Sequence, residues 1–210
     1  MTTETIVFDL GGVVFNWQPA VLLRQVLPDR ATDDALAQHW VREIFQSFDP
    51  ASHWAQFDLG NVEPSELAQR IAGRTGLTLN EVMAVIDGLA PHMRVLPDTV
   101  ALIHDLKARG HRLVYLSNMP HGLARWIEDD HPFANWFDDG IFSARVALMK
   151  PDPAIFRLAR AQLGIQSPAP VFIDDVQHNI DAAHAEGWRG VRFETAAQVR
   201  SQLQLLGLLA

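Results

Sequence analysis

The 210-residue chain contains no cysteine. This absence excludes disulfide bonds, catalysis by a thiolate and zinc sites built from cysteine. The first residues, MTTETIVF, lack a basic segment, and no apolar run approaches the roughly 20 residues that a membrane-spanning helix needs. The sequence therefore predicts a cytoplasmic enzyme or binding protein, with no signal peptide and no membrane partner.

An excess of basic residues is also missing. The chain has 17 Lys and Arg against 25 Asp and Glu, a formal charge of −8, and it contains no basic run. Because clustered Lys and Arg bind the phosphate backbone of nucleic acids, we expect no nucleic-acid partner. An acidic protein can still bind a small anion by local means, such as a helix N-terminus, one well-placed lysine or a metal ion.

Strand and helix patterns alternate along most of the chain. We expect strands at 5–10, 111–118, 140–144, 170–175 and 188–193, and helices at 97–110, 121–130, 152–164, 178–187 and 195–207. Short apolar strands separated by helices of about 10–13 residues are typical of βαβ units and a parallel sheet. The predicted fold class is α/β, with a Rossmann-like, doubly wound parallel sheet as the core.

The segment after the first strand has a different pattern. Amphipathic helices are expected at 19–27, 32–48, 65–76 and 78–90, and no strand interrupts them. Helix starts are indicated at Thr32, at Pro64 and at Thr78, which is followed by Glu81. The sequence thus predicts a core domain formed by residues 1–16 and 95–210, and an inserted helical cap at 17–94.

Polar residues follow several of the predicted strands. Ligands of open α/β sheets bind outside the carboxyl ends of the strands, so these residues are expected to meet at one edge. They are Asp9, Ser117, Asn118, Asp174 and Asp175, and Lys150 lies in the intervening loop. Three carboxylates at one edge repel one another unless a cation joins them, and hard oxygen ligands suit Mg²⁺. A carboxylate beside a bound electrophile is also a candidate nucleophile.

These segments resemble the motifs of the haloacid dehalogenase-like (HAD) hydrolases. FDLGGVV is similar to the first motif of that family, LSN to the second, MKPDP to the third and FIDD to the fourth. The helical segment lies where members with a C1 cap carry their insertion. The similarity is greatest to a subgroup that begins DLG and includes bacterial sugar-phosphate phosphatases, with kinship to the N-terminal domain of epoxide hydrolases.

The resemblance implies a role for each motif. It makes Asp9 the nucleophile, with Ser117 and Lys150 as catalytic groups that hold the phosphoryl oxygens. Mg²⁺ would be held by Asp9, the Gly11 carbonyl, Asp174 and Asp175. The candidates for binding the substrate are Asn118, Gly11, Gly12, Arg42 and His121.

Gly11 departs from the pattern of the family's phosphatases. They usually carry a second Asp at this position, and its carboxyl protonates the leaving group. Glycine retains the carbonyl that binds the metal but lacks the acid, and general acid catalysis contributes roughly 10²–10⁴-fold. A good leaving group would need this proton less. Otherwise it could come from His39, His121, a water bound to Asn16 or the substrate.

The sequence favours a Mg²⁺-dependent phosphatase of small phosphorylated, sugar phosphate-like metabolites, acting through an aspartyl-phosphate as a monomer or homodimer. A metal-independent 2-haloacid dehalogenase is the main alternative, because such enzymes also lack the second Asp; Arg24 or Arg42 could then bind the substrate carboxylate. Paired acids in FIDD favour the phosphatase. A catalytically weak phosphometabolite-binding protein remains open. The cap aromatics are expected to be core residues rather than a substrate platform; they are Trp17, Trp40, Phe45, Trp54 and Phe57.

Overall fold

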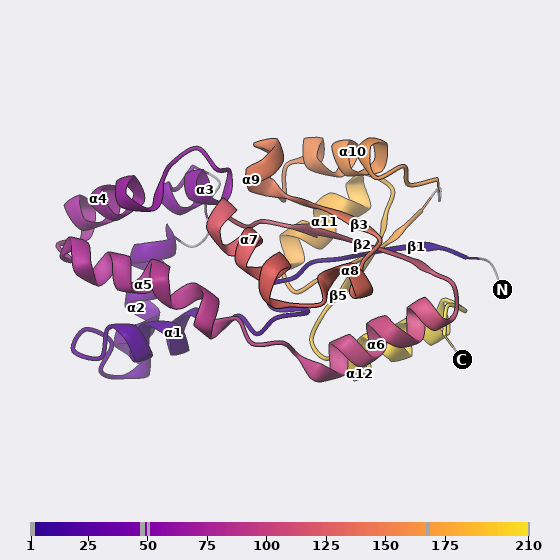
Figure 1. Ribbon diagram of the computed structural model, residues 1–210, viewed down its shortest axis with the longest axis horizontal. Coiled ribbons are helices and arrows are strands. Elements are labelled where there is room, and N and C mark those ends of the chain that lie inside the picture. Colours follow the sequence, from indigo (N-terminus) through magenta and orange to yellow (C-terminus); the bar gives the residue numbers. More distant parts are fainter. Residues whose placement is uncertain (1–2, 47–48, 50, 167–168, 210) are drawn as a thin grey trace.

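The computed structural model describes residues 3–46, 49, 51–166 and 169–209. A five-stranded, wholly parallel sheet forms its centre, in the order β3-β2-β1-β4-β5 (Figure 1). The strands are β1 (Thr5–Phe8), β2 (Arg112–Ser117), β3 (Asp139–Phe142), β4 (Val171–Asp174) and β5 (Arg189–Arg192). This arrangement confirms the predicted α/β class and the doubly wound parallel sheet.

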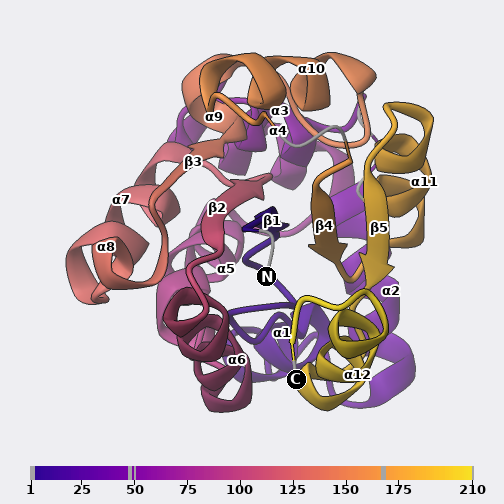
Figure 2. The same cartoon turned by 90° about the vertical axis from the view of Figure 1, so that its right-hand side faces the viewer.

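Helices cover both faces of the sheet (Figure 2). They are α6 (Pro97–Ala108), α7 (His121–Asp130), α8 (Phe133–Trp136), α9 (Ser143–Val146), α10 (Pro153–Gln162), α11 (Gln177–Ala185) and α12 (Ala196–Leu205). Side chains of a strand alternate between two faces. Accordingly Ile6 and Phe8 join a cluster with α6 and α12, whereas Val7 joins a cluster with α10 and α11. Both faces of the sheet are therefore buried, and the ends of its strands are the parts that these helices leave uncovered.

Within the described residues, five helices lie between β1 and α6. They are α1 (Pro19–Val26), α2 (Asp34–Phe45), α3 (His53–Asp58), α4 (Pro64–Thr75) and α5 (Leu79–His92). These helices share a hydrophobic cluster of their own. We refer to them together as the cap. In Figure 1 they extend to the left of the sheet, beyond the carboxyl ends of its strands.

The two chain segments that join the cap to the sheet lie side by side. Phe15 forms an isolated bridge with Val95, and the amide of Asn16 donates to the carbonyl of Arg94 at 2.7 Å. Both connections are thus held together by main-chain hydrogen bonds at the base of the cap. Trp17 and Leu123 pack against the clusters of both the sheet and the cap.

Four of the cap helices begin close to the predicted positions, whereas α3 lies in a stretch for which no helix was predicted. The capping box of Thr78 and Glu81 is present, with hydrogen bonds in both directions. The second helix begins one residue later than the Thr32 start implies, because the Asp33 side chain accepts a hydrogen bond from Leu36 and caps it. Its predicted last residues, 47–48, lie outside the described part of the chain.

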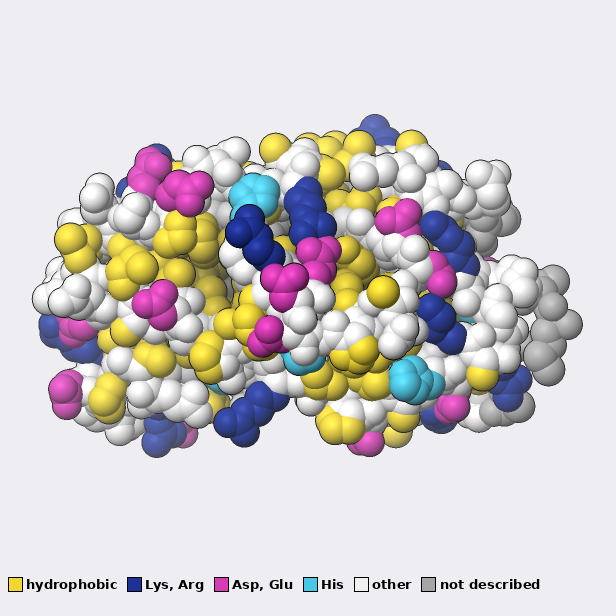
Figure 3. Space-filling view, viewed as in Figure 1, with side chains coloured by type: hydrophobic (Ala, Val, Ile, Leu, Met, Phe, Trp, Pro, Cys, Tyr) yellow, Lys and Arg dark blue, Asp and Glu magenta, His cyan; other side chains and the backbone are white. Residues whose placement is uncertain are grey.

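No helix in the described residues has the length and apolar character required to cross a membrane. On the face shown in Figure 3, basic side chains lie among acidic ones rather than in one basic patch.

Candidate active site

The carboxyl ends of the parallel strands bring distant acids together. Asp9 directly follows β1, Asp174 ends β4, and Asp175 follows it. One carboxylate oxygen from each of the three lies within 4.8 Å of the others. Since β1 and β4 are neighbours in the sheet, pairing of Phe8 with Ile173 is what places the acids side by side.

Lys150 forms an ion pair with Asp9. Its Nζ lies 2.9 Å from Asp9 Oδ1 and 2.6 Å from Asp174 Oδ2, and its side chain is 1% exposed. Asn118 holds the main chain of this lysine: its Nδ2 donates to the Lys150 carbonyl at 2.9 Å, and its Oδ1 accepts from the Lys150 amide at 2.8 Å. A buried ion pair is stable only when further hydrogen bonds fix it, and Asn118 supplies that support here.

Asp174 is fixed by its own loop and helix. Its Oδ1 accepts hydrogen bonds from the Val176 amide at 2.8 Å and from Asn179 Nδ2 at 3.0 Å. The side chain is fully buried. Asp174 therefore joins β4 to the first turn of α11 and holds Lys150 in place.

Asp175 lies against the glycine turn that follows β1. A Cβ on Gly12 would come within 2.4 Å of Asp175 Oδ2, so a larger residue would displace this carboxylate. Gly12 also has a φ of 75°, which favours glycine. The Gly-Gly pair thus leaves room for the second acid of β4.

The charges at this edge are unbalanced. Burial raises the pKa of Asp9 to about 7, with contributions from Asp174 and Asp175, although Lys150 lowers it. Burial and Asp174 raise the pKa of Asp175 to about 6. Burial disfavours the Lys150 ammonium, but Asp174 and Asp9 outweigh this and raise its pKa. One ammonium faces three carboxylates.

The donor set fits a hard divalent cation. Three carboxylates that share an edge offer oxygen ligands, and a further positive charge would offset the repulsion that raises two of their pKa values. The buried Asn179 Oδ1 beside them has no hydrogen-bond partner among the described residues. Asp9, Asp174, Asp175 and the Gly11 carbonyl are the groups that would hold Mg²⁺.

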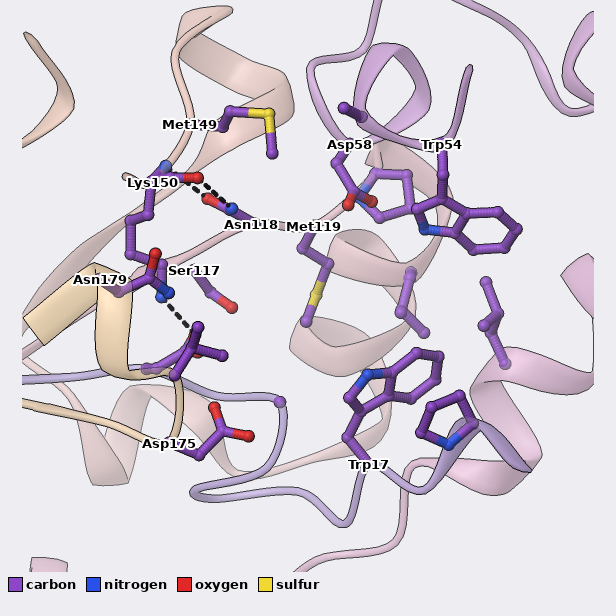
Figure 4. Close-up of a pocket in the computed structure, with 18 of the residues that line it drawn as sticks. Trp17, Trp54, Asp58, Ser117, Asn118, Met119, Met149, Lys150, Asp175 and Asn179 are labelled. Atoms are coloured by element: carbon purple, nitrogen blue, oxygen red, sulfur yellow. Dashed lines mark hydrogen bonds and ion pairs between the residues drawn. The ribbon is translucent and has the colours of Figure 1, made fainter. Parts of the chain in front are cut away.

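A cavity of about 370 Å³ opens above these acids, between the sheet and the cap. Figure 4 shows its two sides: Ser117, Lys150 and Asp175 on the sheet side, and Trp17, Trp54 and Asp58 opposite them. The cap side is mostly apolar, with the further lining residues Leu89 and Met93, and Met119 and Leu123 of the sheet domain add to the apolar lining. A polar sheet edge thus faces an apolar cap.

Asp58 is the exception on the apolar side. It ends α3, is 9% exposed and lines the cavity. Burial raises the pKa of its carboxyl to about 8. Among the described residues no hydrogen bond or ion pair reaches this carboxyl, although its main-chain carbonyl accepts from Ser143 Oγ.

Comparison with known proteins agrees with this geometry. The family model of the haloacid dehalogenase-like hydrolases matches residues 3–187. The chain belongs to this family. It is an enzyme of the hydrolase class.

Three relatives of this hydrolase are informative. The sesquiterpene phosphatase astK of Aspergillus oryzae is 26% identical over 207 residues, which are 98% of each chain. A phosphoglycolate phosphatase of Rhodospirillum rubrum is 32% identical over 88% of this chain and 76% of its own. The HAD family enzyme bt-2542 of Bacteroides thetaiotaomicron, solved with magnesium and inorganic phosphate, superimposes with a TM-score of 0.70 at 19% identity, covering 92% and 95% of the two chains. That last likeness shows the shared fold.

Most residues singled out in the sequence lie at this site of the hydrolase. Asp9, Gly11, Ser117, Asn118, Lys150 and Asp175 line the cavity, while Asp174 and Gly12 lie directly behind it. Asn118 is occupied by the Lys150 main chain, so its position is that of a supporting residue rather than a substrate contact.

The other candidates lie elsewhere. Arg42, His121, His39 and Arg24 are exposed and do not line the cavity, and Arg24 pairs with Asp34. His121 instead lies against Gly60 in the loop after α3. Neither the substrate contact expected of Arg42 and His121 nor the proton source expected of His39 is supported by these positions.

The sequence patterns did not indicate Asp58, and they assigned two cavity-lining aromatic residues to the core alone. Trp17 and Trp54 belong to the cap packing as expected, yet both also line the cavity. Asp58 lies four residues after Trp54, so the two share one face of a short helix. An acidic residue on the same helix face as a buried tryptophan was the sequence feature that could have indicated Asp58 as a cavity residue.

Proposed function

We propose that this hydrolase is a Mg²⁺-dependent phosphatase that cleaves small phosphate monoesters through an aspartyl-phosphate on Asp9. The observation that carries the proposal is the set of three converging carboxylates and one buried lysine at the polar end of an otherwise apolar cavity. With Mg²⁺ bound, such a set could hold a dianionic phosphate in a protein whose net charge is −8.

The proposed reaction begins with attack of an Asp9 carboxylate oxygen on phosphorus. A bond from Asp9 to phosphorus forms as the bond to the leaving oxygen breaks, with the two oxygens in line. The Ser117 hydroxyl donates a hydrogen bond to a remaining phosphoryl oxygen, and the Lys150 ammonium offsets the negative charge of these oxygens. Water then cleaves the aspartyl-phosphate and releases inorganic phosphate. Bound Mg²⁺ would supply a further positive charge at this edge and favour the ionised form of Asp9.

The lining of the cavity favours a substrate with an apolar organic group. Trp17, Trp54, Leu89 and Met93 offer a large apolar contact area, and their only hydrogen-bonding side-chain groups are the indole N–H donors of the two tryptophans. The name of the sesquiterpene phosphatase relative agrees with this class of substrate. We therefore favour phosphate esters of apolar alcohols over sugar phosphates within the same reaction.

The paired acids argue against a haloacid dehalogenase. Asp174 and Asp175 are adjacent, Asp175 lies partly buried beside the cavity, and Lys150 is already shared by Asp9 and Asp174. Such a concentration of carboxylates costs free energy in a site that binds a carboxylate substrate without a metal.

Phosphate release from a panel of esters tests the proposal. Decyl, farnesyl and sugar phosphates are compared with and without Mg²⁺, and 2-haloacids are assayed for halide release in the same buffers. We expect Mg²⁺-dependent phosphate release that EDTA abolishes, with kcat/KM rising with the apolar area of the alcohol.

Asp9→Asn is the test variant, and Asp87→Asn, on the exposed side of α5, is its matched control. Turnover of Asp9→Asn within a few-fold of wild type would overturn the proposal. Halide release in EDTA would support the dehalogenase instead. Ligand-induced thermal stabilisation with no turnover on any ester would identify a binding protein.

A further inference from the structure

The proposed phosphatase needs a proton donor that Gly11 cannot provide. In an in-line displacement the leaving oxygen lies on the side of phosphorus opposite Asp9. Asp9 belongs to the sheet edge, so the leaving oxygen faces the cap. An alkoxide is a poor leaving group, and a carboxyl on the cap side would have to protonate it.

One titratable side chain points into the cavity from the cap among the described lining residues, and it is Asp58. Figure 4 shows its carboxyl on the side opposite Asp175, above Met119 and beside Trp54. The exposed His178 also lines the cavity, but it comes from α11 on the sheet side. Asp58 is therefore the acid whose position matches the leaving oxygen.

The main chain at Asp58 is anchored to the sheet. The Met119 amide donates to Ser143 Oγ at 2.8 Å, and that hydroxyl donates to the Asp58 carbonyl. Ser143 is fully buried. This two-bond relay fixes the end of α3 relative to the loop after β2, while the Asp58 side chain has no partner among the described residues.

We propose that Asp58 is the acid–base residue of this hydrolase, an assignment that rests on the phosphatase function proposed above. As Asp9 attacks and the bond from phosphorus to the leaving oxygen breaks, the Asp58 carboxyl gives its proton to that oxygen, and an alcohol departs. The resulting Asp58 carboxylate then accepts a proton from the water that attacks the aspartyl-phosphate. Phosphate leaves, and the Asp58 carboxyl is regenerated.

The protonation state suits this role. Burial alone raises the pKa of Asp58 to about 8, so its carboxyl carries a proton at neutral pH. The helices that pack against α3 carry charged groups, but these are exposed or partly exposed, and most of them pair with other residues. The pairs are Asp34 with Arg24, Glu43 with Arg74, Glu66 with Arg70, and Arg145 with Glu128, and the exposed groups His39 and Arg42 complete the set on α2, α4 and α9. The groups that face it across the cavity are Asp9, Lys150, Asp175 and His178.

The test compares leaving groups. Asp58→Asn, Asp58→Ala and the control Asp87→Asn are assayed with an alkyl phosphate and with acetyl phosphate, whose carboxylate leaving group needs no proton. General acid catalysis contributes roughly 10²–10⁴-fold, so we expect both Asp58 variants to lose at least ~100-fold in kcat/KM on the alkyl phosphate, a constant that covers the steps up to departure of the leaving group. On acetyl phosphate we expect a loss in kcat/KM below about five-fold, because hydrolysis of the aspartyl-phosphate, in which Asp58 acts as the base for both substrates, does not enter kcat/KM.

The pH profile provides a second readout. Wild-type kcat/KM on the alkyl phosphate is expected to fall above about pH 8, as Asp58 loses its proton, and this fall should be absent on acetyl phosphate. Equal losses on both substrates, or no loss on either, would overturn the assignment of Asp58 while leaving the phosphatase intact. Failure of the wild type on both substrates would overturn the phosphatase and, with it, this role of Asp58.

Discussion

The Ser143 hydroxyl, at the start of α9, donates a hydrogen bond to the main-chain carbonyl of Asp58 at the end of α3. This bond joins the sheet domain to the cap at the only acid that the described cap helices present to the cavity. Because Ser143 also accepts from the Met119 amide, loss of its hydroxyl leaves two main-chain groups without a partner. The position of the cap acid therefore depends on a residue that does not itself touch the cavity.

Ser143→Ala should separate positioning from chemistry. The loss of a buried hydrogen bond, with partners left unsatisfied, is expected to lower the free energy of unfolding by about 1–3 kcal/mol. We expect kcat/KM on an alkyl phosphate to fall about ten-fold, less than in Asp58→Asn, and kcat/KM on acetyl phosphate to change little. Ser201→Ala, which removes an exposed hydroxyl from α12, is the control. Equal effects of the two serine variants would contradict this role of Ser143.

Gly60, two residues after Asp58, tests how closely the cap approaches the sheet domain. Its φ is 74°, and a Cβ there would lie 2.6 Å from His121 Nε2 and 2.8 Å from the Ala144 carbonyl oxygen. Gly76, in the same cap, has a φ of 76° with nothing within 4 Å. Alanine at either position carries a similar backbone cost of about 1–2 kcal/mol, so the difference between the variants isolates the steric contact.

Gly60→Ala is expected to lower the melting temperature more than Gly76→Ala and to reduce turnover of alkyl phosphates at least ten-fold, because the clash with a main-chain oxygen must move the end of α3. Gly76→Ala should retain wild-type kcat. The two variants are compared by thermal melting and by kcat on the same ester. Equal kcat in both would show that the approach of this loop does not matter for catalysis.

The parts of the site that could be predicted are those carried by the sheet. A parallel sheet brings the ends of its strands to one edge whatever the details of packing, so Asp9, Ser117 and Asp174 could be placed together from their strands alone. The third strand was extended too far, because residues 143–144, expected as strand, form the start of α9. The location of the acids can be predicted from the topology of the sheet, and that topology can be predicted from the alternation of strands and helices.

The cap side could not be predicted in the same way. Whether a helical residue faces the cavity depends on the rotation of each helix against its neighbours, and a pattern of apolar residues indicates only that some face is buried. Arg42 was expected at the substrate but is exposed on α2, whereas Asp58 was overlooked although it shares a helix face with Trp54. Tertiary packing decides these directions.

Magnesium should stabilise the folded protein through the three acids. A ligand at 100 times its dissociation constant stabilises by about 2.7 kcal/mol, so saturating Mg²⁺ should raise the melting temperature of the wild type by several degrees. Asp175→Asn is expected to lose this shift, and without Mg²⁺ it should melt at or above the wild-type temperature because a carboxylate facing Asp174 has been removed. Asp87→Asn should respond to Mg²⁺ as wild type does. An undiminished Mg²⁺ shift in Asp175→Asn would contradict its role as a ligand.

Asp58 should also leave a signature in stability. Its pKa is about 8 in the folded protein and near 3.9 when unfolded, so between these values the folded state keeps a proton that the unfolded state releases. The contribution of Asp58 to stability is therefore fully present below about pH 4 and is lost as pH rises towards 8, by at most about 1.4 kcal/mol per pH unit.

Asp58→Asn does not titrate, so its free energy of unfolding should gain on that of the wild type as pH rises. Urea denaturation at pH 5 and pH 8 measures the difference. The free energy of unfolding of the variant minus that of the wild type is expected to be larger at pH 8 than at pH 5 by at least about 1 kcal/mol. A difference that does not vary with pH would show that Asp58 is ionised in the folded protein, and hence not a proton donor at neutral pH.

Gly11→Asp should restore the function that Asp58→Asn removes. A Cβ on Gly11 would lie no closer than 3.9 Å to Met93 and 4.0 Å to Trp17, so a side chain at this position has space at the edge of the cavity. In the wild type, where Asp58 already donates the proton, we expect Gly11→Asp to change kcat on an alkyl phosphate by less than about five-fold. In the Asp58→Asn background the same substitution should recover at least ten-fold, while Gly11→Asn, which is similar in size but carries no acid, recovers nothing. A large gain in the wild type, equal to the gain in the double variant, would mean that the two positions act independently and that no proton reaches the leaving oxygen from Asp58.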